Sequence, residues 1–418
     1  MEIIRYAILA VLFAFCGLAC VQALVASLAR SRGWALAAGL ALASGLLLLL
    51  TGFRDVQRWI VAGLALISAL GGYLGTTYQM MRRREVQALP VLARSPGDPG
   101  QGHTAVVYVT HGEPESYDPS GWINQFREFD EQKIRFVPLV ARPFFLSNLR
   151  KKYQQVGRSG HHAMHQQMLH SLEQAFREQG DGQTRFYLSF LDDQPHPDAA
   201  TIQALNEGAS RLVVAQIFLT DSNHTAEGKA QIAAILEKFP DIPVQTAGPL
   251  HDSDLLKRMF VARANRYLGQ ADRATTGVLL VGHGQPEEWD REWPTETEQE
   301  ISFRLGVLEH FAAEGYLPLN MSLAWMEFRQ PKPAQKIAEF VRNGVERILY
   351  FPAAISADSL HSQADIPELV HKARVPAGIE LVNLGAWNDD PLVIQAIKQK
   401  IAAAMQRFSA IATGGNGA

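Results

Sequence analysis

Cysteine is nearly absent from this sequence, which removes several classes of site. Only two cysteines occur among 418 residues, Cys16 and Cys20, and both lie inside one long apolar run. The rest of the chain therefore has no disulfide, no zinc finger and no cysteine-ligated iron–sulfur cluster.

The chain also lacks an excess of charge of either sign. Its 39 lysines and arginines nearly balance 42 aspartates and glutamates, and the formal net charge is −3. A nucleic-acid-binding surface needs a basic patch or stripe, but arginines gather only beside the apolar N-terminal region. The composition thus gives no reason to expect a nucleic-acid partner.

Several motifs of common enzymes are missing as well. A histidine phosphatase carries arginine directly before a His-Gly pair, but here Thr110 and Gly282 occupy those positions. The chain contains no G-x-S-x-G, no G-x-x-x-x-G-K-[ST] and no G-x-G-x-x-G after an expected strand. These absences exclude the α/β-hydrolase nucleophile, the P-loop and the dinucleotide-binding turn.

Three apolar runs without a charge occupy the first 80 residues. They cover residues 7–29, 34–53 and 59–79. A run of about 20 apolar residues crosses a ~30 Å hydrocarbon core as a helix, so we expect three transmembrane helices in an anchor over residues 1–84. The alternative for the first run is a cleaved signal peptide, but two further runs follow it at once and no A-x-A cleavage site comes after it.

Basic residues beside these runs predict the orientation of the anchor. Arg30 and Arg32 flank the first loop, residues 82–84 are all arginine, and the middle loop contains Asp55 beside its arginines. By the positive-inside rule, we expect the N-terminus outside and everything after residue 80 in the cytoplasm. This predicts a multi-pass protein of the inner (cytoplasmic) membrane with its catalytic part in the cytoplasm.

The rest of the chain has the alternating pattern of an α/β protein. Residues 85–104 are rich in Pro, Gly and polar groups and are interpreted as a linker. After it, short β-rich runs alternate with amphipathic helical patterns, which predicts doubly wound parallel sheets with helices on both faces. The expected strands lie within residues 105–110, 185–191, 211–219, 277–282, 319–327, 347–355 and 379–385.

Two phrases recur in this region. "YVTHGEPESYD" at 108–118 matches "LVGHGQPEEWD" at 280–290. Residues 206–228 match 342–365: a helix ending in glycine, an apolar strand, then Asp-Ser-x-His. Repetition in tandem predicts two similar lobes.

We place the boundary between these lobes near residues 269–277, a basic, loop-like stretch. The N-terminal lobe is then expected over 105–270. The C-terminal lobe, over 275–410, is expected to contain the main metal site.

The repeats place histidines at strand ends. His111 and His283 follow the first strand of each lobe, and His224 and His361 follow the strand of the second repeat. In doubly wound sheets the carboxyl ends of the strands face the ligand crevice, so each lobe can direct two imidazoles to one crevice.

A carboxylate completes the set in the C-terminal lobe. Glu327 ends another strand there, whereas Ser189 is expected at the matching position of the N-terminal lobe. Two imidazoles and a carboxylate suit Fe²⁺, Co²⁺, Ni²⁺ or Zn²⁺. We therefore expect one lobe to perform the chemistry and the other to complete the cleft.

Each of these residues also has a structural interpretation. A single histidine at a strand end is more often structural, but repetition and the nearby Glu327 favour a functional role for His283 and His361. For His111 and His224 both interpretations remain open.

Two further stretches have the same ambiguity. The acidic run at 286–300 is interpreted as a solvated helix start, with metal delivery or proton acceptance as the alternative. His161 and His165, four residues apart, are interpreted as a polar helix face rather than a metal pair.

With these residues in place, residues 104–410 resemble the class II tetrapyrrole metal chelatases, a superfamily that includes ferrochelatase and the CbiX-like sirohydrochlorin cobalto- and ferrochelatases. "VGHGQP" (281–286), "WMEFRQPKPAQKIAEFVRNGVERILYFP" (325–352) and "SADSLHSQADIPELV" (356–370) are similar to segments of the sirohydrochlorin and cobalt chelatases. "INQFREFD" (123–130) and "LRKKYQQVGRSGHHAMHQQMLHSL" (149–172) are similar to the early region of ferrochelatase. Ferrochelatases usually have an S-D-H-x-x-E pattern that this chain lacks.

The resemblance implies a lyase-type chelatase that inserts Fe²⁺ or Co²⁺ into a porphyrin or sirohydrochlorin, in haem, sirohaem or cobalamin biosynthesis. The metal is then a substrate, and no tightly bound cofactor is expected. His283 would be a metal ligand and proton acceptor, His361 a second ligand, and Glu327 a third ligand or proton relay. The expected partners are the tetrapyrrole and the membrane, with a homodimer or another enzyme of the haem or corrinoid pathway as candidate protein partners. The alternative is a non-catalytic, membrane-anchored carrier of a tetrapyrrole or metal on the same fold.

Overall fold

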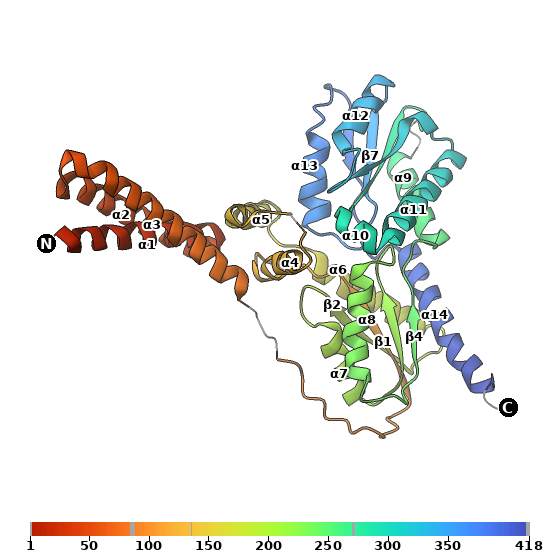
Figure 1. Ribbon diagram of the computed structural model, residues 1–418. Coiled ribbons are helices and arrows are strands. Elements are labelled where there is room, and N and C mark those ends of the chain that lie inside the picture. Colours follow the sequence, from red (N-terminus) through yellow and green to blue (C-terminus); the bar gives the residue numbers. More distant parts are fainter. Residues whose placement is uncertain (1, 84–87, 135, 270–271, 415–418) are drawn as a thin grey trace. The chain divides into compact units, whose positions relative to one another are not determined.

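The computed structural model describes residues 2–83, 88–134, 136–269 and 272–414 (Figure 1). Residues 85–87 of the expected linker and residues 270–271 of the expected lobe boundary lie outside this description. The chain forms two compact units. The anchor unit comprises Met1–Gln87 and Ser116–Arg158, and the α/β unit comprises Ala88–Glu115 and Ser159–Ala418.

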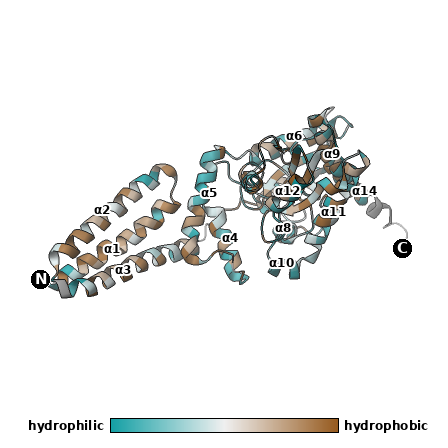
Figure 2. Cartoon of the chain, turned by 90° about the horizontal axis from the view of Figure 1, so that it is seen from above, coloured by the Kyte–Doolittle hydropathy of each residue, from teal (hydrophilic) through white to brown (hydrophobic). Residues whose placement is uncertain are grey.

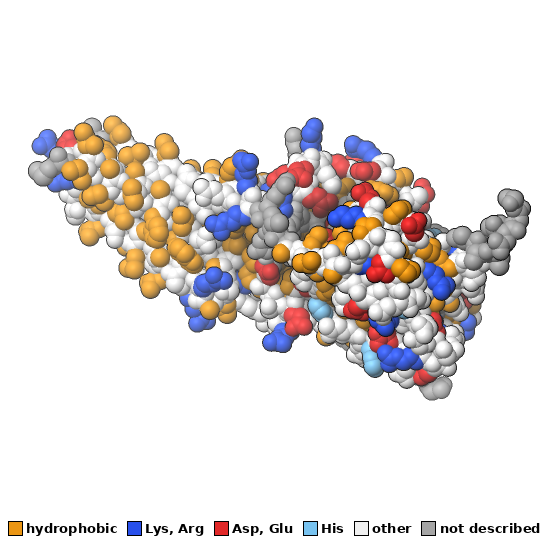
Figure 3. All heavy atoms as spheres, turned by 90° about the horizontal axis from the view of Figure 1, so that it is seen from below, with side chains coloured by type: hydrophobic (Ala, Val, Ile, Leu, Met, Phe, Trp, Pro, Cys, Tyr) orange, Lys and Arg blue, Asp and Glu red, His pale blue; other side chains and the backbone are white. Residues whose placement is uncertain are grey.

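Three long helices dominate the anchor unit: α1 (Glu2–Val25), α2 (Leu28–Gly52) and α3 (Asp55–Arg82). Each is long and apolar enough to cross a membrane. Apolar residues predominate along all three helices (Figure 2) and on the surface that they present in Figure 3. The expectation of three apolar helices is confirmed, with helices somewhat longer than the uncharged runs.

Glycines allow α1 and α3 to pack closely. A Cβ atom added to Gly17 would collide with the Ala69 carbonyl of α3, and one added to Gly72 would collide with the Ala14 carbonyl of α1. Small residues at such positions let two helix backbones approach within an apolar solvent, where association depends on packing contacts.

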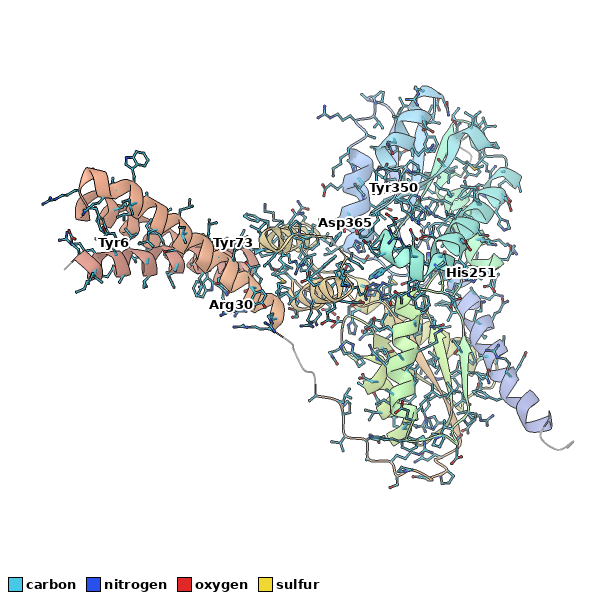
Figure 4. All side chains as sticks on the ribbon, in the orientation of Figure 1. Tyr6, Arg30, Tyr73, His251, Tyr350 and Asp365 are labelled. Carbon is cyan, nitrogen blue, oxygen red and sulfur yellow. The ribbon has the colours of Figure 1, made fainter. Side chains whose placement is uncertain are left out.

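A pair of shorter helices completes the anchor unit: α4 (Ser120–Glu131) and α5 (Arg142–Val156), joined through the 3₁₀ turn η1 (Leu139–Ala141). Trp122 and Phe126 of α4 pack with Val25 of α1 and Met81 of α3 in one apolar cluster. Tyr73 donates a hydrogen bond of 2.7 Å to the Val140 carbonyl, and it lies beside α5 in Figure 4. Residues 116–158, which fall in the range expected for the N-terminal lobe, are therefore compact with the three long helices.

The α/β unit contains two parallel four-stranded sheets with the same topology. Their strand orders are β2-β1-β3-β4 and β6-β5-β7-β8, so each sheet has its first strand between its second and third. This equivalence confirms two similar lobes. The strands are β1 (His103–Thr110), β2 (Thr184–Phe190), β3 (Ala209–Gln216), β4 (Val244–Ala247), β5 (Thr276–Gly282), β6 (Met321–Trp325), β7 (Arg347–Pro352) and β8 (Glu380–Asn383).

Helices connect the strands and cover both faces of the sheets, as expected for parallel strands. They are α6 (His161–Arg177), α7 (Pro197–Asn206), α8 (Asn223–Leu236), α9 (Asp254–Leu268), α10 (Glu287–Glu292), α11 (Pro294–Ala313), α12 (Pro333–Arg342), α13 (Ile366–His371) and α14 (Pro391–Gly414), with a 3₁₀ turn at Pro318–Asn320 and a π-helical turn at His361–Asp365.

The two lobes share one hydrophobic core. Val106 and Val213 of the first sheet belong to the same buried cluster as Val278 and Leu349 of the second. The C-terminal helix α14 contributes Ile397 to this cluster and packs against β3, β4 and α6 of the first lobe (Figure 1). The lobes therefore belong to one compact body.

Candidate active site

The His-Gly phrase of the C-terminal lobe marks a crowded crossing of two chain segments. His283 follows β5, and the next residue, Gly284, has a φ of +83°. A Cβ at Gly284 would lie 2.6 Å from the Glu327 carbonyl oxygen. The Glu327 N–H also donates to the His283 carbonyl at 3.0 Å, so glycine allows the segments after β5 and β6 to lie side by side.

His283 and His361 come together at these strand ends, with ring centroids 5.4 Å apart. His283 Nδ1 lies 2.7 Å from the Gly284 carbonyl oxygen. Because a carbonyl only accepts, Nδ1 carries the proton and the lone pair of the neutral ring is on Nε2.

A carboxylate orients the second imidazole. His361 opens the π-helical turn, and its Nδ1 lies 2.7 Å from Asp365 Oδ2. A ligand histidine commonly donates its other ring N–H to a carboxylate or a backbone carbonyl. Both histidines have this arrangement, which suits Nε2 of each for binding a divalent metal.

The two rings have opposite electrostatic environments. Burial, with a smaller effect from His361, lowers the pKa of His283 to about 3. Burial alone would lower the pKa of His361 too, but the Asp365 hydrogen bond and the charges of Asp365, Glu327 and Glu113 raise it to about 9. At neutral pH His283 is therefore neutral, and His361 carries a proton that must leave when a metal binds to its Nε2.

Glu327 lies near enough to this pair to raise the pKa of His361 by its charge. Over the described ranges, however, no three His, Cys, Asp or Glu side chains are close enough together to hold an ion. The structure thus brings His283 and His361 together without assembling a three-ligand site, and Glu327 as third ligand stays a prediction.

The strand register corrects the comparison between the lobes. Thr110 pairs with Phe190 in the first sheet, and the equivalent residue Gly282 pairs with Trp325 in the second. Ser189 is therefore the counterpart of Ala324, and the expectation that it matches Glu327 was wrong. Two residues after the paired positions, the counterpart of Glu327 is Asp192.

With Asp192, the N-terminal lobe repeats the pattern of the C-terminal lobe. His111 Nδ1 lies 2.8 Å from Asp192 Oδ2, and the His111 and His224 rings are 4.6 Å apart between centroids. Partial desolvation of its ring lowers the pKa of His111, but the adjacent Asp192 raises it above its usual value overall. Burial and then His111 lower the pKa of His224 to about 4. Each lobe thus pairs a neutral imidazole with one that is held by a carboxylate.

Contacts between the lobes join these two sets. Glu113, two residues after His111, accepts a hydrogen bond of 2.9 Å from the N–H of Leu360, which directly precedes His361. His224 lies against Trp289 of the C-terminal lobe, with ring centroids 5.9 Å apart. The two pairs of histidines therefore belong to one site region that both lobes build, and Figure 4 labels Asp365 in this region.

Part of the acidic run lies behind His283 rather than in solvent. Glu300 is only 4% exposed and accepts a hydrogen bond of 3.2 Å from the His283 N–H. Burial, followed by the charges of Glu300 and Asp290, raises the pKa of Glu296 to about 8. The interpretation as a solvated helix start was wrong for Glu300, and Glu296 can exchange a proton near neutral pH.

The histidine pair of α6 is buried, so its interpretation as a polar helix face was also wrong. His165 Nδ1 lies 2.9 Å from the Tyr108 hydroxyl, and its Nε2 lies 3.3 Å from Ser356 Oγ of the other lobe. His161 is 4% exposed. A sequence signal did exist, because His165, Met168 and Leu172 follow helical spacing on one buried face.

Comparison with known proteins places this arrangement in a family. A model of the ferrochelatase family, described as "Ferrochelatase", matches residues 103–405, more than half of the chain. No curated protein matches the sequence.

Solved structures that match the chain include chelatases. SirB from Bacillus subtilis with Fe³⁺ has a TM-score of 0.47 at 13% identity, covering 72% of this chain and 95% of its own. CbiX, described as the terminal enzyme of sirohaem biosynthesis in denitrifying bacteria, has a TM-score of 0.40 at 14% identity, covering 72% and 99%. DR2241 from Deinococcus radiodurans has a TM-score of 0.41 at 13% identity, covering 72% of this chain and 55% of its own.

Proposed function

The chain belongs to the ferrochelatase family, and from this premise we propose that it inserts Fe²⁺ or Co²⁺ into a porphyrin or sirohydrochlorin. The observation that carries the proposal is the His283–His361 pair. Each ring has Nδ1 next to an acceptor, which leaves Nε2 as the metal-binding atom.

Insertion replaces two pyrrole N–H protons by one M²⁺, so the site must hold a metal and accept two protons. One imidazole lone pair cannot do both at the same time. We assign the metal to His283, His361 and Glu327. The free Nε2 of neutral His283 is available first, and His361 joins when it loses its proton.

The second set of histidines, His111 and His224, can provide the proton acceptor. His111 is held by Asp192 in the way that His361 is held by Asp365. A carboxylate beside an imidazole stabilises the imidazolium that forms when the ring takes a proton. We assign this role to His111, which takes the two protons in turn and passes each to water because its side chain is 46% exposed, and we regard His224 as the neutral ring beside it.

The test is anaerobic absorption spectroscopy of the full-length protein in detergent. Sirohydrochlorin and coproporphyrin are each offered Fe²⁺ and Co²⁺. We expect one combination to be metallated, with His283→Ala slower by about 100-fold or more and His111→Ala slower by about tenfold. His310→Ala, at the exposed His310–Asp254 pair, is the matched control and should keep full activity.

The outcomes separate the roles. Added imidazole should restore His111→Ala by supplying a diffusible proton acceptor. Full activity of His283→Ala would contradict the metal assignment. Tetrapyrrole binding without metallation in any combination would favour the carrier.

We also propose that α1, α2 and α3 form a multi-pass anchor in the inner (cytoplasmic) membrane, with the α/β unit in the cytoplasm. The basis is their length, hydropathy and flanking arginines. Protease added to right-side-out spheroplasts should leave the α/β unit intact, and cleavage should require lysis. Cleavage of intact spheroplasts would reverse the orientation.

A further inference from the structure

The anchor unit contains a cavity of about 710 Å³ where the end of α3 meets α4 and η1. This volume is in the range of ordinary small-molecule sites, roughly 300–1,000 Å³. Arginines, apolar side chains and the carboxylates of Asp130 and Glu131 line it. Its wall includes Tyr78, Met81, Arg82, Arg127, Leu139 and Arg142.

One of the three arginines is already neutralised inside the protein. Arg142 is 5% exposed and forms a two-pronged pair with the Asp130 carboxylate, with one N–O distance of 2.7 Å. It also donates to the Val137 carbonyl at 3.1 Å. Arg142 therefore fixes the shape of the wall and contributes little free charge.

The other two arginines keep donors for a ligand. Arg82 donates to the Tyr78 hydroxyl at 2.7 Å, and Arg127 donates to the Arg83 carbonyl at 3.0 Å and to the Asn124 side chain. A guanidinium group has five N–H donors in a planar fork, so at least three remain on each side chain. This fork matches the oxygens of a phosphate and binds them with charge-assisted hydrogen bonds.

The position of the cavity indicates which kind of phosphate-containing ligand it would bind. Tyr78 and Arg82 lie in the last turns of a helix long and apolar enough to span a membrane. The apolar wall, with Met81 and Leu139, adjoins this end, and Leu74, one turn before Tyr78 on α3, is 40% exposed. A phosphate bound by the arginines would thus be next to a surface suited to hydrocarbon. Basic pockets at the cytoplasmic ends of membrane helices bind acidic lipid headgroups in this way.

We propose that this cavity is a binding site for one anionic phospholipid, with its phosphate between Arg82 and Arg127 and its chains along α3. This inference rests on the proposed membrane location. It does not depend on the chelatase activity, because the cavity is lined only by residues of the anchor unit.

The test is native mass spectrometry of the full-length protein in detergent, titrated with phosphatidylglycerol or phosphatidylcholine. We expect one tightly bound phosphatidylglycerol, with phosphatidylcholine at least about tenfold weaker. Arg82→Gln/Arg127→Gln should weaken phosphatidylglycerol binding about tenfold or more. Arg83→Gln/Lys151→Gln removes two exposed cations of the same unit outside the cavity lining and should change it less than about twofold.

Other outcomes would overturn the proposal. Equal losses in both double variants would show that general surface charge attracts the lipid, and equal binding of both lipids would show that no headgroup is recognised. Displacement of the lipid by coproporphyrin, or by free glycerol phosphate at similar concentration, would assign the cavity to a carboxylate or to a soluble anion. Arg82→Gln alone, which loses only the bond to Tyr78, serves if the double variant unfolds.

Metallation is measured separately on the same samples. We expect Arg82→Gln/Arg127→Gln to keep wild-type turnover in detergent. Selective lipid binding without metallation would uphold this site while removing the chelatase, and metallation without selective lipid binding would do the reverse.

Discussion

Asp365→Asn tests the electrostatic basis of metal binding most directly. Asp365 raises the pKa of His361 through a hydrogen bond of 2.7 Å and through its charge, and the result is a pKa of about 9 instead of 6.5. An opposite charge at this distance typically shifts a pKa by about 1–3 units. With asparagine the neutral side chain can still accept the hydrogen bond, but burial then acts on His361 with less opposition.

The pH dependence of metallation should show this change. His361 binds metal only after losing its proton, so the wild-type rate should rise with pH until about 9. In Asp365→Asn this rise should move to lower pH by about 1–2 units, which is roughly 1.4–2.7 kcal/mol of interaction. Above pH 9 the variant should be slower than wild type, because loss of a carboxylate behind a ligand histidine typically costs about 10–100-fold in metal affinity or activity.

The assay is the initial rate of metallation between pH 6 and 10, at subsaturating metal. Asp254→Asn is the matched control, because it alters an exposed His–Asp pair of similar length, 3.0 Å between His310 Nε2 and Asp254 Oδ1. An unshifted profile in Asp365→Asn would refute the electrostatic reasoning. A rate that falls as pH rises in the wild type would refute His361 as a ligand.

Three further predictions concern stability. Burial first, then neighbouring imidazoles, lowers the pKa of His283 and His165 to about 3. At these two histidines the unfolded chain binds more protons than the folded one below pH 6.5, so each should lower thermal stability between pH 6.5 and 5 by at most about 1.4 kcal/mol per pH unit. Because Glu296 and His361, with raised pKa values of about 8 and 9, oppose this fall, the test compares wild type with His165→Gln, and an equal slope in that variant would contradict the burial of His165. Gly284→Ala should lower the free energy of unfolding by about 1–3 kcal/mol, because a Cβ would lie 2.6 Å from the Glu327 carbonyl oxygen at a φ of +83°. Gly182→Ala, with open space around it, should be nearly neutral in the same thermal unfolding experiment. Gly72→Leu should separate α1 from α3 and reduce the yield of monodisperse protein in detergent. Gly71→Leu should not, because a Cβ there meets nothing within 4 Å, and equal effects of the two substitutions would contradict the packing of these helices.

Much of the fold was predictable because the chain repeats itself. Apolar runs and helical patterns alternate, and His111 and His283 each follow a buried central strand, so tandem parallel sheets and strand-end histidines could be inferred from the letters alone. The repeated Asp-Ser-x-His likewise predicted the places of His224 and His361.

The partner of His111 could not be found in the same way. The segment from Phe190 to Pro195 is one residue shorter than the segment from Trp325 to Pro331. Because of this length difference, aligning the two segments by sequence alone does not pair Asp192 with Glu327. Only the pairing of β1 with β2, and of β5 with β6, sets the register.

Tertiary packing decided two other features. The polar residues around His161 suggested a solvent-exposed helix face, but the Tyr108 hydroxyl is a hydrogen-bond partner for His165 inside the protein. The association of residues 116–158 with the three long helices depends on contacts between segments far apart in sequence, such as Trp122 with Val25. The helical spacing of His165, Met168 and Leu172 was the signal for the first feature, whereas the second has no periodic signal in the sequence.

The C-terminal helix α14 limits how the two lobes can move. It follows the last strand of the second lobe but packs against β3, β4 and α6 of the first, so the first lobe is covered by a helix that belongs to the second. Opening the two lobes away from each other would pull α14 from β3 and β4 and expose the shared core. We therefore expect the lobes to shift by small sliding movements, so that adjustment to a flat macrocycle comes mainly from side chains at the strand ends.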